Sequence, residues 1–175
     1  LLGFANELAD EASKITLKHF RSTIHFEDKV DQSPVTQADR DVEELLRAMI
    51  KKKYPSHGII GEEYGSENEK AEFVWTLDPI DGTVSFINGV PLFTTLVGVI
   101  KQGLPYLGVI DQPVLKDRWS GSDKRIIYKS NVAKTRPCED VELASLYTTA
   151  HEIFDQSESI KFKSLENKVR SSRVG

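Results

Sequence analysis

The chain lacks several features that would place it in a special class of protein. Its 175 residues include one cysteine, Cys138, so an internal disulfide is excluded and a reducing compartment is favoured. No apolar run approaches the ~18 residues that suggest a membrane span, and no repeat or low-complexity tract is present. A basic excess is also missing, because 23 Lys and Arg residues are set against 27 Asp and Glu residues, a net charge of −4. We therefore expect that the protein binds neither a membrane nor a nucleic acid. We expect it in the cytoplasm or, if a transit peptide precedes this sequence, in the stroma of an organelle.

The composition that remains is typical of a folded domain. Apolar residues make up 39% and charged residues 29% of the chain, and its length is enough for a sizeable core. The chain begins at Leu1-Leu2 with no Met and no signal-peptide pattern. Its last residues, 171–175, resemble the beginning of a strand. We therefore interpret the sequence as part of a longer protein.

Apolar spacing predicts two helices, and shorter apolar runs predict strands. A helical stripe covers residues 1–21, and a second helix runs from Thr36 to a stop at Pro55. Thr36-x-x-Asp39 is the pattern of a capping box, which by itself explains Asp39. The remaining predictions are extended segments at 26–30, 58–61, 73–77, 92–100, 104–110, 118–120, 125–128 and 143–149, a short helix or turn at 83–88, and a helix at 155–168. The tight connection at residues 101–103 predicts that segments 92–100 and 104–110 form an antiparallel hairpin. This order predicts an α+β or layered α/β fold.

The segment from Trp75 to Thr83 carries the strongest chemical signal. Pro79 fixes its own φ and pushes Asp78 towards an extended conformation, so the chain is expected to leave its strand stiffly and turn. Asp78 and Asp81 can then converge with the Ile80 carbonyl between them, and such oxygens suit a hard cation that holds a phosphate. The alternative is an ordinary turn, because Asp-Pro and Asp-Gly both end strands.

A second pair of acids, Glu62-Glu63, follows the strand predicted at 58–61. Alone, such a doublet is typical of a solvated loop. Acids at the ends of two neighbouring strands repel each other unless something positive lies between them. The two acidic segments together therefore favour a cation site.

Three ordered motifs resemble the inositol monophosphatase family of magnesium-dependent phosphatases. They are Val35-Thr36-x-x-Asp39, Gly61-Glu62-Glu63, and Trp75-x-x-Asp78-Pro79-Ile80-Asp81-Gly82-Thr83-x-x-Phe86. Within the family, residues 85–93 and 108–119 look most like the histidinol-phosphatase branch. The resemblance implies the layered α/β/α/β sugar-phosphatase fold, with a helix pair and a mainly antiparallel sheet. It places the metal and phosphate motif in residues 1–120 and the start of an incomplete second half in residues 121–175, and it implies a homodimer at full length.

The resemblance also implies a ligand set for two or three Mg²⁺ ions. Glu62, Asp78 and the Ile80 carbonyl would bind one ion, and Asp78 would bridge to a second. Asp81 would bind that second ion, whose remaining protein ligand would be an aspartate that this sequence does not contain. Lys29 matches, loosely, a lysine that the family places beside the metals.

Phosphate binding and catalysis are assigned by the same resemblance. Asp81 and the N–H groups of Gly82 and Thr83 would hold the phosphate, and Glu62, Asp39 and Thr83 would be catalytic. Thr83, hydrogen-bonded to Asp39, would orient or help to activate the metal-bound water.

We expect hydrolysis of a small phosphorylated metabolite, with histidinol phosphate in histidine biosynthesis as the first candidate. The alternatives within the family are an inositol monophosphatase or a related sugar or nucleotide phosphatase. Two rivals come from other classes. Phosphatases with an aspartyl nucleophile typically show Asp-x-Asp, whereas this chain has Asp78-x-x-Asp81. A non-catalytic metal-binding chain, or an inactive truncated one, is the other rival.

Overall fold

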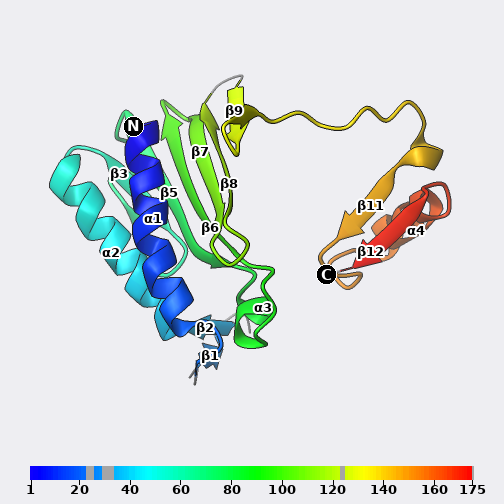
Figure 1. The fold of residues 1–175 in the computed structure, drawn as a ribbon, viewed down its shortest axis with the longest axis horizontal. Coiled ribbons are helices and arrows are strands. Elements are labelled where there is room, and N and C mark those ends of the chain that lie inside the picture. Colours follow the sequence, from blue (N-terminus) through cyan, green and yellow to red (C-terminus); the bar gives the residue numbers. More distant parts are fainter. Residues whose placement is uncertain (23–25, 29–33, 123–124, 175) are drawn as a thin grey trace. The chain divides into compact units, whose positions relative to one another are not determined.

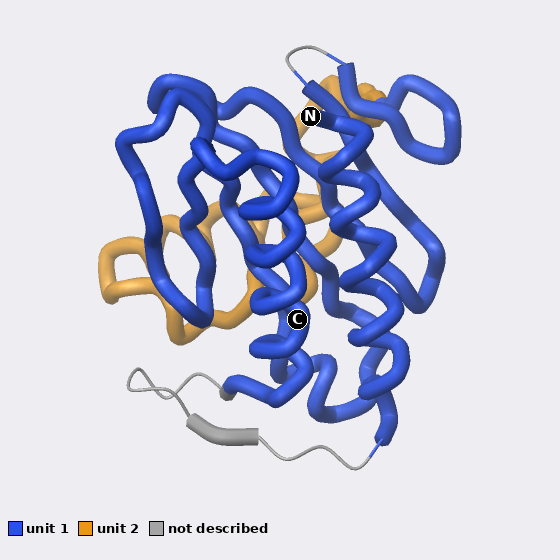
Figure 2. Tube along the Cα trace, turned by 90° about the vertical axis from the view of Figure 1, so that its left-hand side faces the viewer, with its two compact units in different colours: residues 1–133 blue, residues 134–175 orange. Residues whose placement is uncertain are grey.

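The computed structural model describes residues 1–22, 26–28, 34–122 and 125–174, so His25 and Lys29 lie outside the described residues. The chain divides into two compact units, Leu1–Ala133 and Lys134–Gly175, which are described separately (Figure 2). The first unit ends beyond the boundary that we expected at residue 120, because the strands on both sides of that position belong to one sheet. No helix in the described ranges is long and apolar enough to cross a membrane.

The first unit combines helices with a large mixed sheet (Figure 1). Its helices are α1 (Leu2–His19), α2 (Gln37–Lys53) and α3 (Thr83–Ile87). Its strands are β1 (Phe26–Asp28), β2 (Pro34–Thr36), β3 (Gly58–Gly61), β4 (Gly65–Glu67), β5 (Phe73–Asp81), β6 (Thr94–Lys101), β7 (Leu104–Gln112), β8 (Asp117–Ser122), β9 (Arg125–Tyr128) and β10 (Asn131–Val132). Both long helices and the α+β class agree with the sequence prediction.

The main sheet has the strand order β10-β9-β8-β7-β6-β5-β3-β4. Its neighbouring strands are antiparallel except β3 and β5, which run parallel. β6 and β7 form the hairpin predicted around residues 101–103, where Gln102 and Gly103 have positive φ angles of 50° and 81°. Two successive positive φ angles match a type I′ turn, which suits the twist of a two-residue hairpin. The parallel pair β3–β5 is the one that brings two carboxyl ends to the same edge of the sheet.

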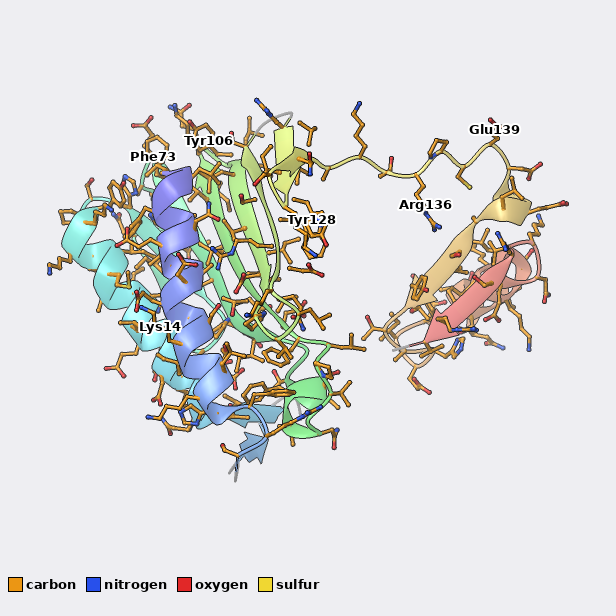
Figure 3. The ribbon with its side chains drawn as sticks, viewed as in Figure 1. Lys14, Phe73, Tyr106, Tyr128, Arg136 and Glu139 are labelled. Carbon is orange, nitrogen blue, oxygen red and sulfur yellow. The ribbon has the colours of Figure 1, made fainter. Side chains whose placement is uncertain are left out.

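Helices α1 and α2 pack side by side on one face of this sheet (Figure 1). The apolar stripe of α1 meets the indole of Trp75 from β5, where the rings of Phe4 and Trp75 lie edge to face with centroids 5.6 Å apart. Burying such a side chain contributes about 1.5–3 kcal/mol. At one end of the sheet the rings of Phe73 and Tyr106 are also in contact, with centroids 6.0 Å apart (Figure 3). A second cluster, formed by Ala38, Ile80, Phe86 and Phe93, lies under the segment that follows β5.

The start of α2 confirms the predicted capping box. Thr36 is the N-cap, its hydroxyl accepts a hydrogen bond from the Asp39 N–H, and Asp39 Oδ2 accepts one from the Thr36 N–H at 2.9 Å. Each partner satisfies a backbone donor that the helix start leaves open. The same capping contact fixes the Asp39 carboxylate in the first turn of α2.

The second unit is a small strand–helix–strand arrangement. It contains η1 (Val141–Leu143), β11 (Ser145–Thr148), α4 (Gln156–Glu166) and β12 (Ser171–Val174), and β11 pairs with β12 in parallel. Asp155 and Glu158 form a capping box at the start of α4, which agrees with the predicted helix at 155–168. None of the described residues of this unit is buried. The side chains that carry chemistry in the sequence motifs all belong to the first unit.

Candidate metal and phosphate site

The parallel pairing of β3 and β5 places the two acidic segments next to each other. Gly61 is paired with Leu77, and the Glu62 N–H donates to the Leu77 carbonyl at 3.2 Å. The residues that follow these two partners are Glu62 and Asp78, so both acids stand at the same edge of the sheet. The two carboxyl groups are close enough for Glu62 to raise the pKa of Asp78.

β5 does not end at Leu77 as predicted but continues to Asp81 through an irregularity in its pairing with β6. Asp78 is paired with Leu96 and Asp81 with Thr94, and the register shifts between the two acids. Pro79 has no N–H to donate to a ladder, but its carbonyl accepts a hydrogen bond from the Thr95 hydroxyl at 2.8 Å. The bulge therefore keeps both acids in a strand held by β6, where the sequence suggested a turn.

Gly82 and Thr83 make the turn that follows β5. Gly82 has φ 91°, and a Cβ at this position would lie 2.8 Å from the Leu92 carbonyl oxygen. The left-handed backbone and the close approach both require glycine. α3 begins at Thr83, whose hydroxyl donates to the Ile80 carbonyl at 3.0 Å.

The expected hydrogen bond between Thr83 and Asp39 is absent from the described part of the chain. The Thr83 hydroxyl is directed to Ile80, and Asp39 Oδ2 accepts from both the N–H and the hydroxyl of Thr36, at 2.9 and 2.5 Å. The cause is the capping box, which already provides Asp39 with local donors. Burial raises the pKa of Asp39, the Thr36 contacts lower it, and the charge of Glu62 raises it further. Asp39 thus lies within electrostatic range of the acidic pair.

Asp78 is the most perturbed acid of the site. Its pKa is raised to about 8, first by burial and then by the charge and hydrogen bond of Glu62, with smaller contributions from Asp81 and Asp39. Its Oδ1 atom is buried and has no hydrogen-bond partner among the described residues. A buried polar atom without a partner costs roughly 1–3 kcal/mol, so a ligand that paired with this oxygen would stabilise the site.

A pocket of about 340 Å³ opens at the acidic pair. Its lining consists of Ile60, Gly61, Glu62, Thr76, Leu77, Asp78 and Leu96. A larger hollow of about 530 Å³ lies over β7 and β8, and its lining contains no acidic or basic side chain. Of these two hollows, the smaller one is therefore the one lined by carboxylates.

Comparisons with known proteins identify the family of the chain. The family model described as "Inositol monophosphatase family" matches residues 1–175. The chain belongs to the inositol monophosphatase family. Family membership also confirms the resemblance that the three sequence motifs indicated.

Relatives and solved structures carry the same family identity. A bifunctional phosphatase of Arabidopsis thaliana (IMPL2, chloroplastic) is 42% identical over 97% of this chain and 50% of its own length. A histidinol-phosphatase of Chlorobaculum parvum is 44% identical over 65% of this chain and 44% of its own length. The solved inositol monophosphatase of Zymomonas mobilis superposes with a TM-score of 0.86 at 36% identity, over 99% of this chain and 68% of that chain. The fold is therefore that of the inositol monophosphatases, and the chain spans about half the length of the curated relatives it matches.

The donor set of this family member fits a hard cation. Its oxygens come from two carboxylates in contact, a third carboxylate further along β5 and a backbone carbonyl, which are the ligands that Mg²⁺ prefers. Within the described ranges, no three His, Cys, Asp or Glu side chains converge closely enough to share one ion. Because like-charged carboxylates repel each other, a bound cation would favour their closer approach. The partnerless Asp78 Oδ1 is the specific sign that the fit is to a cation.

Two residues of the site region were missed in the sequence. Glu43 and Arg47 of α2 are an ion pair at 2.8 Å, with Glu43 fully buried and Arg47 6% exposed. From the sequence, only the apolar residues of α2 were expected to be buried. In the structure, Glu43 and Arg47 are buried as well. An acid followed four residues later by arginine is a common surface pattern, so the spacing alone would not have found them.

Proposed function

We propose that the protein is a magnesium-dependent phosphomonoesterase and that this chain carries its metal and phosphate site. The observation that carries the proposal is the buried, partnerless Oδ1 of Asp78 beside Glu62, in a chain of the inositol monophosphatase family. A structural strand end would not bury an acid among other acids without compensation. A bound cation would provide this compensation, because it would pair with Asp78 Oδ1 and offset the negative charges of the acids.

In this proposal Glu62, Asp78 and the Ile80 carbonyl would hold one ion, and Asp78 and Asp81 would hold a second. When bound, Mg²⁺ supplies positive charge to the phosphoryl oxygens and lowers the pKa of water. The neutral Thr94 hydroxyl donates to Asp81 Oδ2 at 3.3 Å, which orients that carboxylate without removing its charge. The burial of Ile80 holds its carbonyl in place between the acids.

The residues after β5 are proposed to hold the phosphate and direct the water. The N–H groups of Gly82 and Thr83 would donate to phosphate oxygens, since Gly82 carries no Cβ that would keep a ligand away. The Thr83 hydroxyl would orient the attacking water. Its present hydrogen bond to Ile80 holds it at the carbonyl proposed to face the cation. Asp39, in electrostatic range of Glu62, would accept a proton or balance charge as water is activated.

The proposed substrate is a small phosphorylated metabolite, with histidinol phosphate as the first choice. Relatives named histidinol-phosphatase from Chlorobaculum parvum and Mycobacterium tuberculosis are 44% and 38% identical over about two thirds of this chain. An inositol monophosphate is the second choice. It is supported by the solved Zymomonas mobilis inositol monophosphatase and by a tomato inositol monophosphatase that is 29% identical over 99% of this chain.

Phosphate release from histidinol phosphate, an inositol monophosphate and a nucleotide bisphosphate tests both levels of the proposal. The full-length protein is purified and assayed with Mg²⁺ and with EDTA. We expect turnover with Mg²⁺ alone, fastest on histidinol phosphate. Preference for an inositol monophosphate would change the substrate but keep the reaction. Full turnover in EDTA would overturn the proposed chemistry.

A further inference from the structure

Glu43 makes contacts that reach from α2 to the turn carrying Glu62. Its carboxylate accepts hydrogen bonds from the Glu63 N–H at 2.7 Å, the Tyr64 N–H at 3.1 Å and the Arg47 Nε–H at 2.8 Å. All three donors meet one carboxylate that is fully buried. Two of them are the backbone groups that immediately follow Glu62.

Arg47 holds the far side of the same turn. Its Nη1 donates to Glu67 Oε1 at 2.9 Å, and its Nη2 donates to the Gly65 carbonyl. The guanidinium therefore ties β4, on the far side of the turn, to Glu43. An arginine does this well because its donors point in fixed directions.

Gly61 provides an independent sign that this contact is built in. A Cβ at Gly61 would lie 1.9 Å from Glu43 Oε1 and 2.6 Å from Arg47 Nη2. The two side chains are buried and hydrogen-bonded, so neither can move aside easily. Because Gly61 has no side chain, the Glu43–Arg47 pair can pack directly against the backbone of the turn.

We propose that Glu43 and Arg47 are positioning residues that hold the Glu62 carboxylate beside Asp78 for metal binding. One side of Glu62 is fixed by β5, through the hydrogen bond from its N–H to Leu77. The other side is fixed by Glu43, through the N–H groups of the next two residues. This inference rests on the proposed function, because it assumes that Glu62 is a metal ligand.

Metal affinity provides the test. Mn²⁺ substitutes for Mg²⁺ as a paramagnetic probe, and its binding to the purified protein is followed by electron paramagnetic resonance. Glu43→Gln keeps the side-chain shape but offers one acceptor oxygen in place of two, so the turn loses a hydrogen bond. We expect Mn²⁺ to bind about 10-fold or more weakly, the scale typical of residues that orient metal ligands. Hydrogen exchange at the Glu63 and Tyr64 amides should accelerate in the same variant.

A second buried pair gives a matched control. Asp111 is 4% exposed, and it accepts from Arg118 Nε at 2.7 Å and from the Ser13 hydroxyl at 2.5 Å, which ties α1 to the sheet. Asp111→Asn should lower the melting temperature as Glu43→Gln does while leaving Mn²⁺ affinity within about twofold of wild type. If Glu43→Gln does not fold, Arg47→Lys decides the question in the same way, because lysine keeps the charge but cannot reach Glu43, Glu67 and Gly65 together.

The outcomes separate this inference from the proposed function. Weaker Mn²⁺ binding in Glu43→Gln or Arg47→Lys, but not in Asp111→Asn, supports positioning. Equal Mn²⁺ affinity in wild type and the Glu43 or Arg47 variants overturns positioning and leaves the metal site standing. A wild-type protein that binds no Mn²⁺ overturns the proposed metal site, and the inference falls with it.

Discussion

Glu43 and Asp78 are two acids of the first unit, and the groups around them differ in the sign of their charge. Glu43 is fully buried and is met by a guanidinium and two backbone N–H groups. Asp78 is half-buried and is met by the charges of Glu62, Asp81 and Asp39, with one oxygen left without a partner. The fold therefore compensates a buried carboxylate fully where it serves as support. It leaves Asp78 without such compensation, which is the contrast on which the proposed cation site rests.

The largest expected effect comes from neutralising the uncompensated acid. Asp78→Asn keeps the shape but removes the charge proposed to bridge two ions. Phosphatase activity should fall by more than the roughly 10–100-fold that the loss of a supporting residue costs. Steady-state assays at saturating Mg²⁺ measure the change, with Asp111→Asn as the matched control. Near-normal turnover in Asp78→Asn would show that the contrast between the two acids has no catalytic meaning.

A neutral residue of the same site sharpens the comparison. Thr83→Ala removes a hydroxyl but keeps the backbone N–H, so phosphate binding should survive. The attacking water, however, loses the hydroxyl proposed to orient it. We expect kcat to fall about 10²–10⁴-fold, the usual value of one positioned catalytic group. Mg²⁺ affinity should stay close to wild type. Unchanged kcat would remove Thr83, and with it the role given to Asp39, from the mechanism.

Stability should respond to the two acids in opposite directions. Glu43→Ala leaves the Arg47 charge buried without its partner, which typically costs about 3–5 kcal/mol in free energy of unfolding. Asp78→Asn removes repulsion among carboxylates, so the metal-free protein should become more stable. Urea unfolding in EDTA measures both free energies. Destabilisation by both substitutions would mean that Asp78 is compensated after all.

Local patterns in the sequence predicted much of this fold. The capping box at Thr36 was predicted from residues three apart, and the β6–β7 hairpin from a three-residue connection. The acids of β3 and β5 were found because their residue types and spacing are unusual. The layered fold itself came from the family resemblance and is confirmed by the solved relatives.

Contacts between distant segments could not be predicted in the same way. β5 was predicted to end at Leu77 because nothing near Pro79 shows that the Pro79 carbonyl will accept a hydrogen bond from the Thr95 hydroxyl of β6. Glu43 and Arg47 look like surface residues until β3 and β4 bring the turn against them. The Thr83–Asp39 bond was expected from the family and is replaced by local partners for both side chains.

The smallest expected effect concerns pH and uses the raised pKa of Asp78. In the folded, metal-free protein this carboxyl holds its proton up to about pH 8, whereas in the unfolded chain it releases it near its ordinary value of 3.8. The folded state thus binds more protons between these values, so stability falls as pH rises through that window. The lowered pKa of His57 acts in the opposite direction, because burial favours its neutral form.

The contribution of Asp78 is isolated by comparison with its own variant. Melting temperatures of wild type and Asp78→Asn are measured in EDTA at pH 5 and pH 8. The stability gained by Asp78→Asn should be larger at pH 8 than at pH 5. An equal difference at both pH values would contradict the raised pKa.

Calorimetric titration of Mg²⁺ into the purified protein, without substrate, tests the central claim most directly. The same titration is run on Asp78→Asn and on the control Asp111→Asn. The site described here predicts saturable Mg²⁺ binding in wild type and in Asp111→Asn, and its loss in Asp78→Asn. Indistinguishable isotherms for wild type and Asp78→Asn would contradict the assignment of Asp78 and its neighbours as a metal site.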